Sequence, residues 1–364
     1  MFPTDKLRWL SLTSVFVAFV SSIVIYPEAW HSFSTLAPTV STQPVIHQLA
    51  HKTTLPLVIW HGLGDSYDAT GLQETVDVVK SLYPNTYVKV IQLGDTGSAD
   101  RQETFFGNVT EQLQRVCTDL AEDEILKSAP AINALGFSQG GQFLRGYVER
   151  CNTPPVHNLV TFGGQHNGIS EFESCSSATD FACQAANALL KLGTWTPTVQ
   201  SRLVPAQYYR DSDDLSSYLS YSNFLADINN ERKHKNRHYA DNIARLNRFV
   251  MYMFSDDTTV VPKESSWFGD YNKTSQKATP LELRPIYQED WLGLRMLAEK
   301  GGIVYDLLQG EHMQFSQEAL TTVVKSYFGP VQLNLDRHLF DNHPDDRNQK
   351  DALLLHPDEE KHDL

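Results

Sequence analysis

The serine at position 138 stands in a pattern suited to nucleophilic catalysis. The residues Gly136-Phe-Ser138-Gln-Gly140 follow an apolar run at 131–135 and begin a stretch of helical periodicity at 139–150. A serine on such a strand-to-helix turn is exposed at the end of the strand, and the small neighbours leave room for the turn. The first N–H groups of the helix face charge that develops beside the serine. The pattern predicts Ser138 as a nucleophile and the N–H of Gln139 as an oxyanion donor.

An acid and a histidine are needed to activate this serine, because its hydroxyl is a weak nucleophile near neutral pH. On an α/β sheet of this kind both residues follow the serine in the chain, each after a late strand. Asp256 and Asp257 follow the apolar run 249–254, and His312 follows the run 302–308. The order of serine, aspartate and histidine is therefore satisfied, although spacing alone does not separate the two aspartates.

A second oxyanion donor is expected from the loop after the first strand. His61-Gly-Leu-Gly-Asp65 follows the apolar run 55–60, so the backbone N–H of Leu63 is the predicted donor. We expect a structural role for His61, which precedes the serine, and a structural or pocket-lining role for His166. The cysteines form no CxxC pair, and the sequence indicates no metal or organic cofactor.

The elements that must position these residues alternate between strands and helices. Such alternation predicts a mostly parallel, doubly wound α/β sheet. The rhythm breaks at 169–247, where the chain is polar and aromatic without clear strands, and we predict a lid-like helical insertion over the active site. The strands are expected at 55–60, 87–93, 131–135, 156–162, 249–254 and 302–308, and the helices at 70–82, 109–125, 139–150 and 317–327.

The two ends of the chain differ from the predicted catalytic domain at 54–330. Residues 1–27 place Lys6 and Arg8 before an apolar run, which predicts a signal peptide or an uncleaved signal anchor. An uncleaved anchor is the one membrane contact expected. Residues 28–53 are rich in Ser, Thr and Pro and read as a linker, and 331–364 as an acidic disordered tail. The tail ends in Lys361-His-Asp-Leu364, a weak match to an ER-retrieval signal.

Charge and cysteine content narrow the class of protein further. The 364-residue chain has a formal net charge of −14, which argues against nucleic-acid binding because neutralising phosphates needs a basic footprint. Four cysteines in a secretory protein suggest two disulfides. Sequons at Asn108 and Asn272 agree with exposure to the lumen of the secretory pathway. The four cysteines are Cys117, Cys151, Cys175 and Cys183.

Long strings of the sequence resemble the lysosomal type of palmitoyl-protein thioesterase. The resemblance covers about 55–329 and implies the α/β-hydrolase fold, with hydrolysis of palmitoyl and other long-chain acyl thioesters on S-acylated proteins through a serine acyl-enzyme. The matching strings are Leu57-Val-Ile-Trp-His-Gly-Leu-Gly-Asp-Ser66, Gly136-Phe-Ser-Gln-Gly-Gly-Gln-Phe-Leu-Arg145, Gly163-Gly-Gln-His166, Phe224-Leu-Ala-Asp-Ile-Asn229, Val261-Pro262, Ser266-Trp-Phe-Gly269 and Gly310-Glu-His312.

The resemblance also assigns individual residues. It selects Asp257 as the acid beside Ser138 and His312, and it implies the disulfides Cys117–Cys151 and Cys175–Cys183. It places an apolar acyl groove in the insertion at 169–247, with Leu189, Leu190, Phe224 and Leu225 as candidate wall residues that could equally be core. A lysosome or vacuole is the compartment it favours, with the ER or secretion as alternatives.

Two features leave the prediction open. The family often has adjacent cysteines after the His-Gly loop, whereas Tyr67 and Asp68 follow Ser66 here. The triad does not itself distinguish a thioester from an oxygen ester. A general lipase or esterase with the same triad, and a noncatalytic lipid-binding relative, therefore remain the alternative functions.

Overall fold

The computed structural model describes residues 52–172, 180–190, 192–272 and 275–332. The predicted signal segment and nearly all of the predicted linker lie outside these residues, as do Cys175 and the tail beyond Gln332. Within the described residues the centre is a six-stranded sheet of order β3-β2-β4-β5-β6-β9, in which every neighbouring pair is parallel. These strands are β2 (Leu57–Trp60), β3 (Val88–Val90), β4 (Ile132–Phe137), β5 (Val156–Phe162), β6 (Arg248–Phe254) and β9 (Ile303–Leu308).

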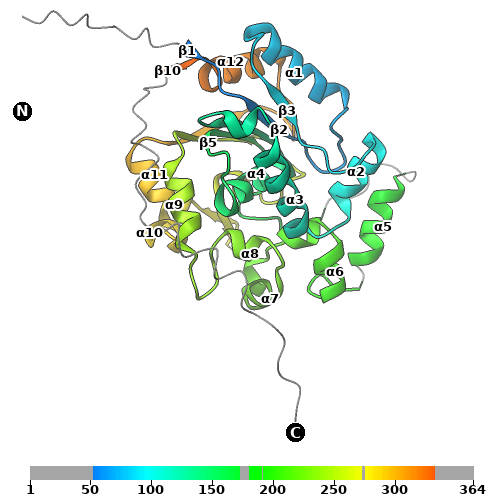
Figure 1. Ribbon diagram of the computed structural model, residues 1–364. Coiled ribbons are helices and arrows are strands. Elements are labelled where there is room, and N and C mark those ends of the chain that lie inside the picture. The colour runs from blue at the N-terminus through cyan, green and yellow to red at the C-terminus, as the bar shows by residue number, and fades with distance from the viewer. Residues whose placement is uncertain (1–51, 173–179, 191, 273–274, 333–364) are drawn as a thin grey trace, which may run out of the picture. The chain divides into compact units, whose positions relative to one another are not determined.

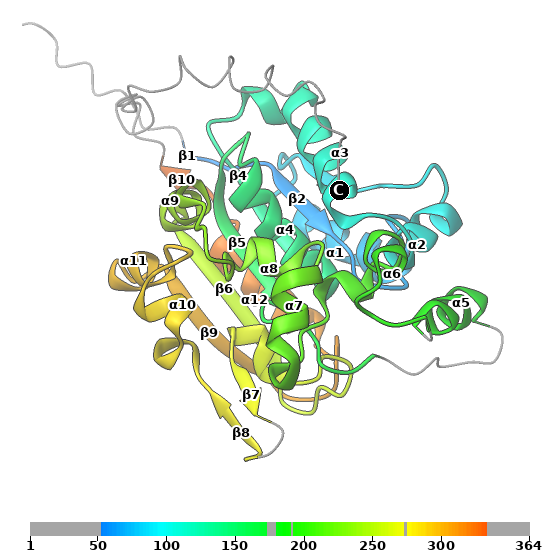
Figure 2. The ribbon, with the colours of Figure 1, turned by 90° about the horizontal axis from the view of Figure 1, so that it is seen from below.

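Helices cover both faces of this sheet (Figures 1 and 2). Every residue of β2 and β4 is buried, as expected for parallel strands that are covered on both faces. One face packs against α1 (Thr70–Leu82) and α12 (Gln317–Tyr327). The other packs against α3 (Val109–Glu122), α4 (Gln139–Arg150) and α9 (Arg237–Arg245). This is the predicted doubly wound α/β-hydrolase architecture.

The disulfide between Cys117 and Cys151 joins two of these helices. It links α3 to the residue that follows α4, with the two Cα atoms 5.9 Å apart. This is the first of the two pairs that the family resemblance implies.

The described part of the insertion is helical. It contains α5 (Phe181–Leu190), α6 (Pro197–Arg202), α7 (Leu215–Tyr221), α8 (Leu225–Ile228) and α9, with 3-10 turns η2 (Pro205–Tyr208) and η3 (Ser212–Asp214). Figure 2 shows α5 and α6 beside α2 (Gly97–Phe105), a helix that sequence periodicity did not predict. Helix α2 begins where the side chain of Thr96 accepts a hydrogen bond from the N–H of Ala99, so a cap rather than an apolar stripe marks it.

The sequence pattern also did not predict several smaller elements. The segment of the chain that connects β6 to β9 contains a hairpin of β7 (Asp270–Asn272) and β8 (Lys277–Thr279). The same segment contains four short helical elements, η4 (Lys263–Trp267), η5 (Leu281–Leu283), α10 (Pro285–Gln288) and α11 (Leu294–Glu299). A short turn, η1 (Leu126–Ser128), follows α3. Strand β1 (Lys52–Thr53) pairs with β10 (Val331–Gln332). Strand β1 is formed by the last two residues of the predicted linker, and β10 by the first two residues of the predicted tail. Strand β3 ends at Val90, three residues before the prediction.

Candidate active site

Ser138 occupies a strained turn between β4 and α4. Its backbone has φ 49° and ψ −120°, a conformation that non-glycine residues rarely adopt. The turn needs small neighbours, because a Cβ on Gly136 would lie 2.4 Å from the Cα of Gly141 and one on Gly140 would lie 2.3 Å from the carbonyl oxygen of Trp60. The serine is therefore held at the carboxyl end of β4 by a backbone that only this glycine pattern permits.

The side chains of Ser138, His312 and Asp257 form a continuous chain of contacts. Nε2 of His312 lies 2.9 Å from Oγ of Ser138, and Nδ1 lies 2.7 Å from Oδ2 of Asp257. The other oxygen of Asp257 accepts hydrogen bonds from the N–H groups of Thr259 and Val260, at 3.0 and 2.8 Å. These bonds hold the carboxylate in place, so the turn after β6 orients the imidazole.

Asp256, which spacing could not separate from Asp257, has different surroundings. Its side chain is exposed and accepts a hydrogen bond from the hydroxyl of Ser255. The contact with His312 belongs to Asp257, the residue that the family resemblance selects.

The loop after β2 runs directly beside the serine. A Cβ built on Gly62 would lie 3.1 Å from Cβ of Ser138, and the next residue, Leu63, lines the cavity in front of the serine. Gln139 is the first residue of α4, where a backbone N–H has no acceptor in the preceding turn. The loop and the helix start therefore place the two predicted donors, Leu63 and Gln139, in segments that adjoin Ser138.

Helix α2 holds this loop through Asp100, a residue that sequence reasoning missed. Its carboxylate lies 2.8 Å from Nε2 of His61 and accepts hydrogen bonds from the N–H groups of Tyr67, Leu93 and Gly94. Burial alone would raise the pKa of Asp100, but the bonds from His61, Leu93 and Tyr67 outweigh burial and lower it. His61 thus has the structural role expected of it.

Two further residues of α2 fix Gly64 at the end of the loop. The N–H of Gly64 donates to Oγ1 of Thr104, and its carbonyl oxygen accepts from Nε of Arg101, both at 2.8 Å. Arg101 also pairs with Asp180, beside the start of α5, at 3.0 Å. Only the cap at Thr96 signals this helix in the sequence, because its buried face carries Asp100 and Thr104 instead of an apolar stripe.

The loop after β5 supplies a second hydrogen-bond partner for Oγ of Ser138. Nε2 of Gln165 donates to Oγ of Ser138 at 3.0 Å. The next residue, His166, is fully buried, contacts Oγ1 of Thr161 at 3.0 Å and stacks on Phe268. Burial, with the nearby guanidinium of Arg145, lowers the pKa of His166 well below its ordinary value. His166 is thus structural, whereas its neighbour Gln165 contacts the hydroxyl of Ser138.

A cavity of about 580 Å³ opens from Ser138 and His312 beneath the insertion. Of the candidate wall residues, Leu190 lines it, whereas Leu189 packs in an adjoining apolar cluster. Phe224 and Leu225 are fully buried in the core and do not line it. The apolar side chains that face the cavity include Leu63, Phe105, Phe137, Ile169, Ala186, Leu190 and Leu203.

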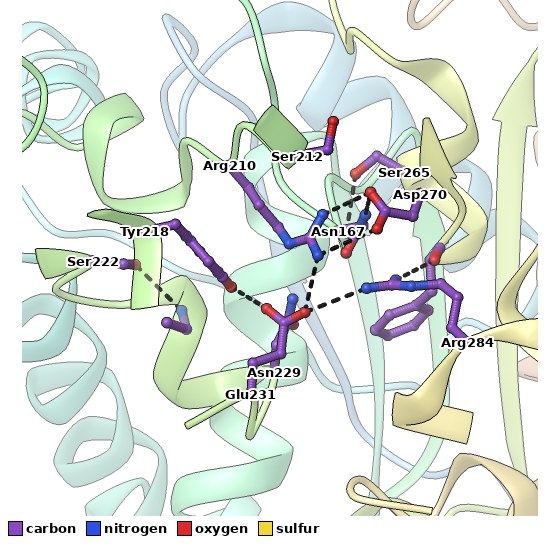
Figure 3. Close-up of polar contacts among 12 residues, drawn as sticks. Asn167, Arg210, Ser212, Tyr218, Ser222, Asn229, Glu231, Ser265, Asp270 and Arg284 are labelled. Atoms are coloured by element: carbon purple, nitrogen blue, oxygen red, sulfur yellow. Dashed lines mark hydrogen bonds and ion pairs between the residues drawn. The ribbon is translucent and has the colours of Figure 1, made fainter. Parts of the chain in front are cut away.

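A buried ion network fastens the insertion to the rest of the domain (Figure 3). Arg210 pairs with Asp270 at 2.7 Å and with Glu231 at 3.2 Å, and Glu231 also pairs with Arg284 at 3.3 Å. Burial opposes the charge on Glu231, but Arg210 and Arg284 outweigh burial and lower the pKa of this carboxyl. The hydroxyl of Tyr218 donates to the same carboxylate. The charges of two buried arginines are thus balanced by two carboxylates, of which Asp270 is partly exposed.

The predicted sequon asparagines lie at two different kinds of position. Asn272 is exposed at the end of β7, although the rest of its sequon is outside the described residues. Asn108 is half-buried, and its side chain caps α3 by accepting from the N–H of Thr110 at 3.0 Å.

No group of three metal-ligating side chains occurs among the described residues. Nor does any described helix have the length and apolar character that a membrane crossing requires.

Comparison with known proteins identifies the family. A family model described as palmitoyl protein thioesterase matches residues 56–312. The chain belongs to the palmitoyl-protein thioesterase family. As a member of this family it is a thioester hydrolase, and acyl thioesters such as palmitoylated proteins are its class of substrate.

Curated relatives agree with this assignment. The thioesterase is 37% identical to palmitoyl-protein thioesterase 1 of Caenorhabditis elegans over 75% of this chain and 92% of the relative. It is 33% identical to palmitoyl-protein thioesterase 3 of Dictyostelium discoideum, over 70% and 83%. Lysosomal thioesterase PPT2 of Rattus norvegicus is 27% identical, over 72% and 82%.

Two solved structures resemble this chain weakly and at low sequence identity. Est1E of Butyrivibrio proteoclasticus, solved with ferulic acid, has a TM-score of 0.41 at 12% identity, covering 75% of this chain and 88% of that one. The RedJ thioesterase of Streptomyces coelicolor has a TM-score of 0.37 at 11% identity, covering 75% and 85%.

Proposed function

We propose that this thioesterase removes palmitoyl and other long-chain acyl groups from protein cysteines through an acyl-enzyme on Ser138. The observation that carries the proposal is the unbroken chain of contacts from Asp257 through His312 to Ser138, at the mouth of an apolar cavity. His312 is the general base and acid, and Asp257 orients it. These are the roles that this arrangement of side chains has in acyl transfer.

The reaction takes place in two steps. Oγ of Ser138 attacks the thioester carbonyl carbon while His312 Nε2 takes the hydroxyl proton, and the C–S bond then breaks as the cysteine sulfur receives that proton. Water attacks the resulting ester, gives a proton to His312, and the fatty acid leaves as Oγ is protonated again. Asp257 accepts the Nδ1–H bond throughout and stabilises the imidazolium.

We assign the stabilisation of the oxyanion that forms in both steps to the backbone N–H groups of Leu63 and Gln139. They come from the loop after β2 and from the start of α4, which flank Ser138. Donors fixed before the reaction stabilise developing charge without reorganising, and removing one typically costs 10²–10³ in kcat. The support that α2 gives to this loop is consistent with that requirement.

The acyl chain is assigned to the cavity beneath the insertion at 169–247. Its apolar lining would bury the methylenes of a long chain, each worth about 0.8 kcal/mol of gross transfer free energy. Part of that free energy is lost in ordering the chain. The cysteine and its polypeptide would remain outside the cavity.

A lysosome or vacuole is the compartment that we propose. The relatives named lysosomal thioesterases, the Cys117–Cys151 disulfide and the sequons support a path through the secretory pathway. A signal peptide or signal anchor at residues 1–27, the second disulfide and use of both sequons belong to the same proposal.

Two measurements test the function. A fluorophosphonate probe should label the wild-type protein and fail to label Ser138→Ala. Turnover of a palmitoyl-cysteine peptide should exceed that of the matched oxygen ester. Faster hydrolysis of the oxygen ester by orders of magnitude would instead indicate a general esterase, and palmitate binding without turnover would indicate a noncatalytic relative.

A further inference from the structure

Oγ of Ser138 contacts two side chains, not one. His312 lies on one side at 2.9 Å, and the amide nitrogen of Gln165 donates from the other at 3.0 Å. Gln165 is 4% exposed and lines the cavity. The catalytic scheme above assigns no role to this amide, although it touches the atom that forms and breaks the covalent bond.

A second glutamine fixes which end of the Gln165 amide faces the serine. Nε2 of Gln142, which is fully buried in α4, donates to Oε1 of Gln165 at 3.3 Å. Turning both amides over would put the NH₂ group of Gln142 where its oxygen now has no partner among the described residues. Buried N–H groups without acceptors are rarer and costlier than carbonyl oxygens without donors. The nitrogen of Gln165 therefore faces Ser138.

The loop that carries Gln165 is held by the two residues that follow it. His166 is held by Thr161, and the N–H of Asn167 donates to Oγ of Ser265 at 3.0 Å. The side chain of Asn167 donates to the carbonyl oxygen of Gly269 at 2.9 Å, beside the network of Figure 3. A donor on such a rigid loop stays at one position while the serine reacts.

We propose that Gln165 is a catalytic residue whose N–H stabilises Oγ of Ser138 as the leaving group when the acyl-enzyme is hydrolysed. The proposal rests on the acyl-enzyme scheme above. In the ground state Oγ accepts from Gln165, so its own hydrogen is directed to His312 Nε2, the direction that general-base catalysis needs.

The two chemical steps place different demands on this donor. In acylation the C–S bond breaks, and a thiolate is a good leaving group because the thiol has a pKa near 8.5. In deacylation the C–Oγ bond breaks, its electron pair goes to Oγ, and Oγ takes the proton from His312. An alkoxide is a much stronger base than a thiolate, so a donor to Oγ accelerates deacylation more than acylation.

The test compares the two steps in Gln165→Met, which is similar in length and has no donor. Acid quenching during steady-state turnover of a palmitoyl thioester, followed by mass spectrometry of the Ser138 peptide, gives the acylated fraction. Thiol release in a single turnover gives the acylation rate. We expect deacylation to slow by about ten- to a hundredfold, the range for a hydrogen bond to a charged group. Acylation should change by less than about threefold, so acyl-enzyme accumulates.

The glutamine Gln200 provides the matched control. It is buried in α6, where its amide donates to the carbonyl oxygens of Thr194 and Ala206. Gln200→Met removes an equally buried amide and should leave the acylated fraction at the wild-type value. Gln165→Asn keeps an amide but is one methylene shorter, so it should accumulate acyl-enzyme and serves if Gln165→Met does not fold.

These experiments distinguish a failure of the role proposed for Gln165 from a failure of the acyl-enzyme mechanism on which that role rests. A wild-type acylated fraction in both Gln165 variants, or an equal loss in both steps, would overturn the role of Gln165 while leaving Ser138 as nucleophile. Turnover by Ser138→Ala would overturn the acyl-enzyme scheme itself. In Gln165→Glu, an ionised carboxylate would draw the Ser138 hydrogen away from His312, so fluorophosphonate labelling should be slower than in Gln165→Met. Equal labelling rates would contradict the proposal that the group at position 165 directs the Ser138 hydrogen to His312.

Discussion

The carboxylate of Asp100 lies 2.8 Å from Nε2 of His61, and both side chains are buried. The same carboxylate accepts hydrogen bonds from the backbone of Tyr67, Leu93 and Gly94. One residue of α2 therefore fixes the loop after β2 to the chain that follows β3. Because Leu63 lies in the first of these loops, the proposed oxyanion site would depend on Asp100, a residue that does not line the cavity.

Replacing Asp100 with asparagine should reduce catalysis more than binding. In the wild type the backbone N–H groups of Tyr67, Leu93 and Gly94 donate to the carboxylate of Asp100. In the variant the amide nitrogen of the asparagine would face some of these N–H groups and could not accept from them, so the loop that carries Leu63 would shift. We expect kcat to fall by about 10²-fold, as when an oxyanion donor is lost, with little change in KM. Asp95→Asn changes an exposed aspartate of the neighbouring loop and should retain wild-type kinetics. An equal rise in KM would indicate a damaged cavity instead.

The two adjacent aspartates after β6 offer a matched pair of variants. Asp257→Asn would keep the shape of the side chain but favour the wrong imidazole tautomer of His312. On the proposed mechanism kcat should therefore fall by about 10⁴, as the equivalent change does in a Ser-His-Asp protease. Asp256→Asn changes an exposed carboxylate that contacts Ser255 and should alter kcat by less than about twofold. Steady-state kinetics on a palmitoyl thioester check both values. A comparable loss in the two variants would contradict the assignment of Asp257.

The sequence predicted the sheet and the bounds of three helices correctly, because apolar periodicity and glycine positions report them directly. Helices 70–82, 139–150 and 317–327 begin and end where expected. It missed α2 because that helix buries Asp100 and Thr104, so the apolar pattern is absent. The contact of Gln165 with Ser138 was missed for a related reason. It depends on where the loop after β5 meets the start of α4, which no local pattern encodes.

A larger side chain at Ala186 of α5 should shorten the acyl chain that the cavity accepts. Ala186 lines the cavity and is 6% exposed. Ala186→Phe would fill part of the space assigned to the acyl chain. If four methylenes were displaced, palmitoyl substrates would lose about 3 kcal/mol of transfer free energy, which is more than a hundredfold in kcat/KM. Octanoyl substrates should be affected by less than about threefold. Ala185→Phe, at an exposed position of the same helix, should leave the chain-length profile unchanged; a matching shift there would show that α5 itself had moved.

The ion network of Figure 3 should contribute strongly to stability through Glu231. Glu231→Gln would leave the buried guanidinium groups of Arg210 and Arg284 short of one negative charge. Removing one partner of a buried ion pair typically costs about 3–5 kcal/mol. Denaturant unfolding measures this cost. The control is Glu299→Gln, because Glu299 is 69% exposed and pairs with Arg295 at 3.9 Å; its effect should be within about 0.5 kcal/mol. Similar effects in both variants would show that the network is not a main source of stability.

Stability should rise at acid pH because of Glu149, which lies in α4, the helix that follows Ser138. Burial raises the pKa of Glu149 to about 7, against the opposing effect of Arg145, whose Nη1 lies 2.8 Å away. Its second oxygen has no partner among the described residues. In the unfolded chain a glutamate titrates near 4.3, so the folded protein binds the extra proton between about pH 4.5 and 7.

The stabilising contribution is therefore complete below about pH 4.5 and is lost as the pH rises through 7. On this basis the free energy of unfolding of the wild type should fall across that window by on the order of 3 kcal/mol more than that of Glu149→Gln. The variant keeps the shape of the side chain but cannot titrate, so it corrects for every other ionisable group. Denaturant unfolding at pH 4.5, 5.5 and 7 would give the difference. Parallel pH profiles would mean that Glu149 is ionised in the folded protein throughout this range.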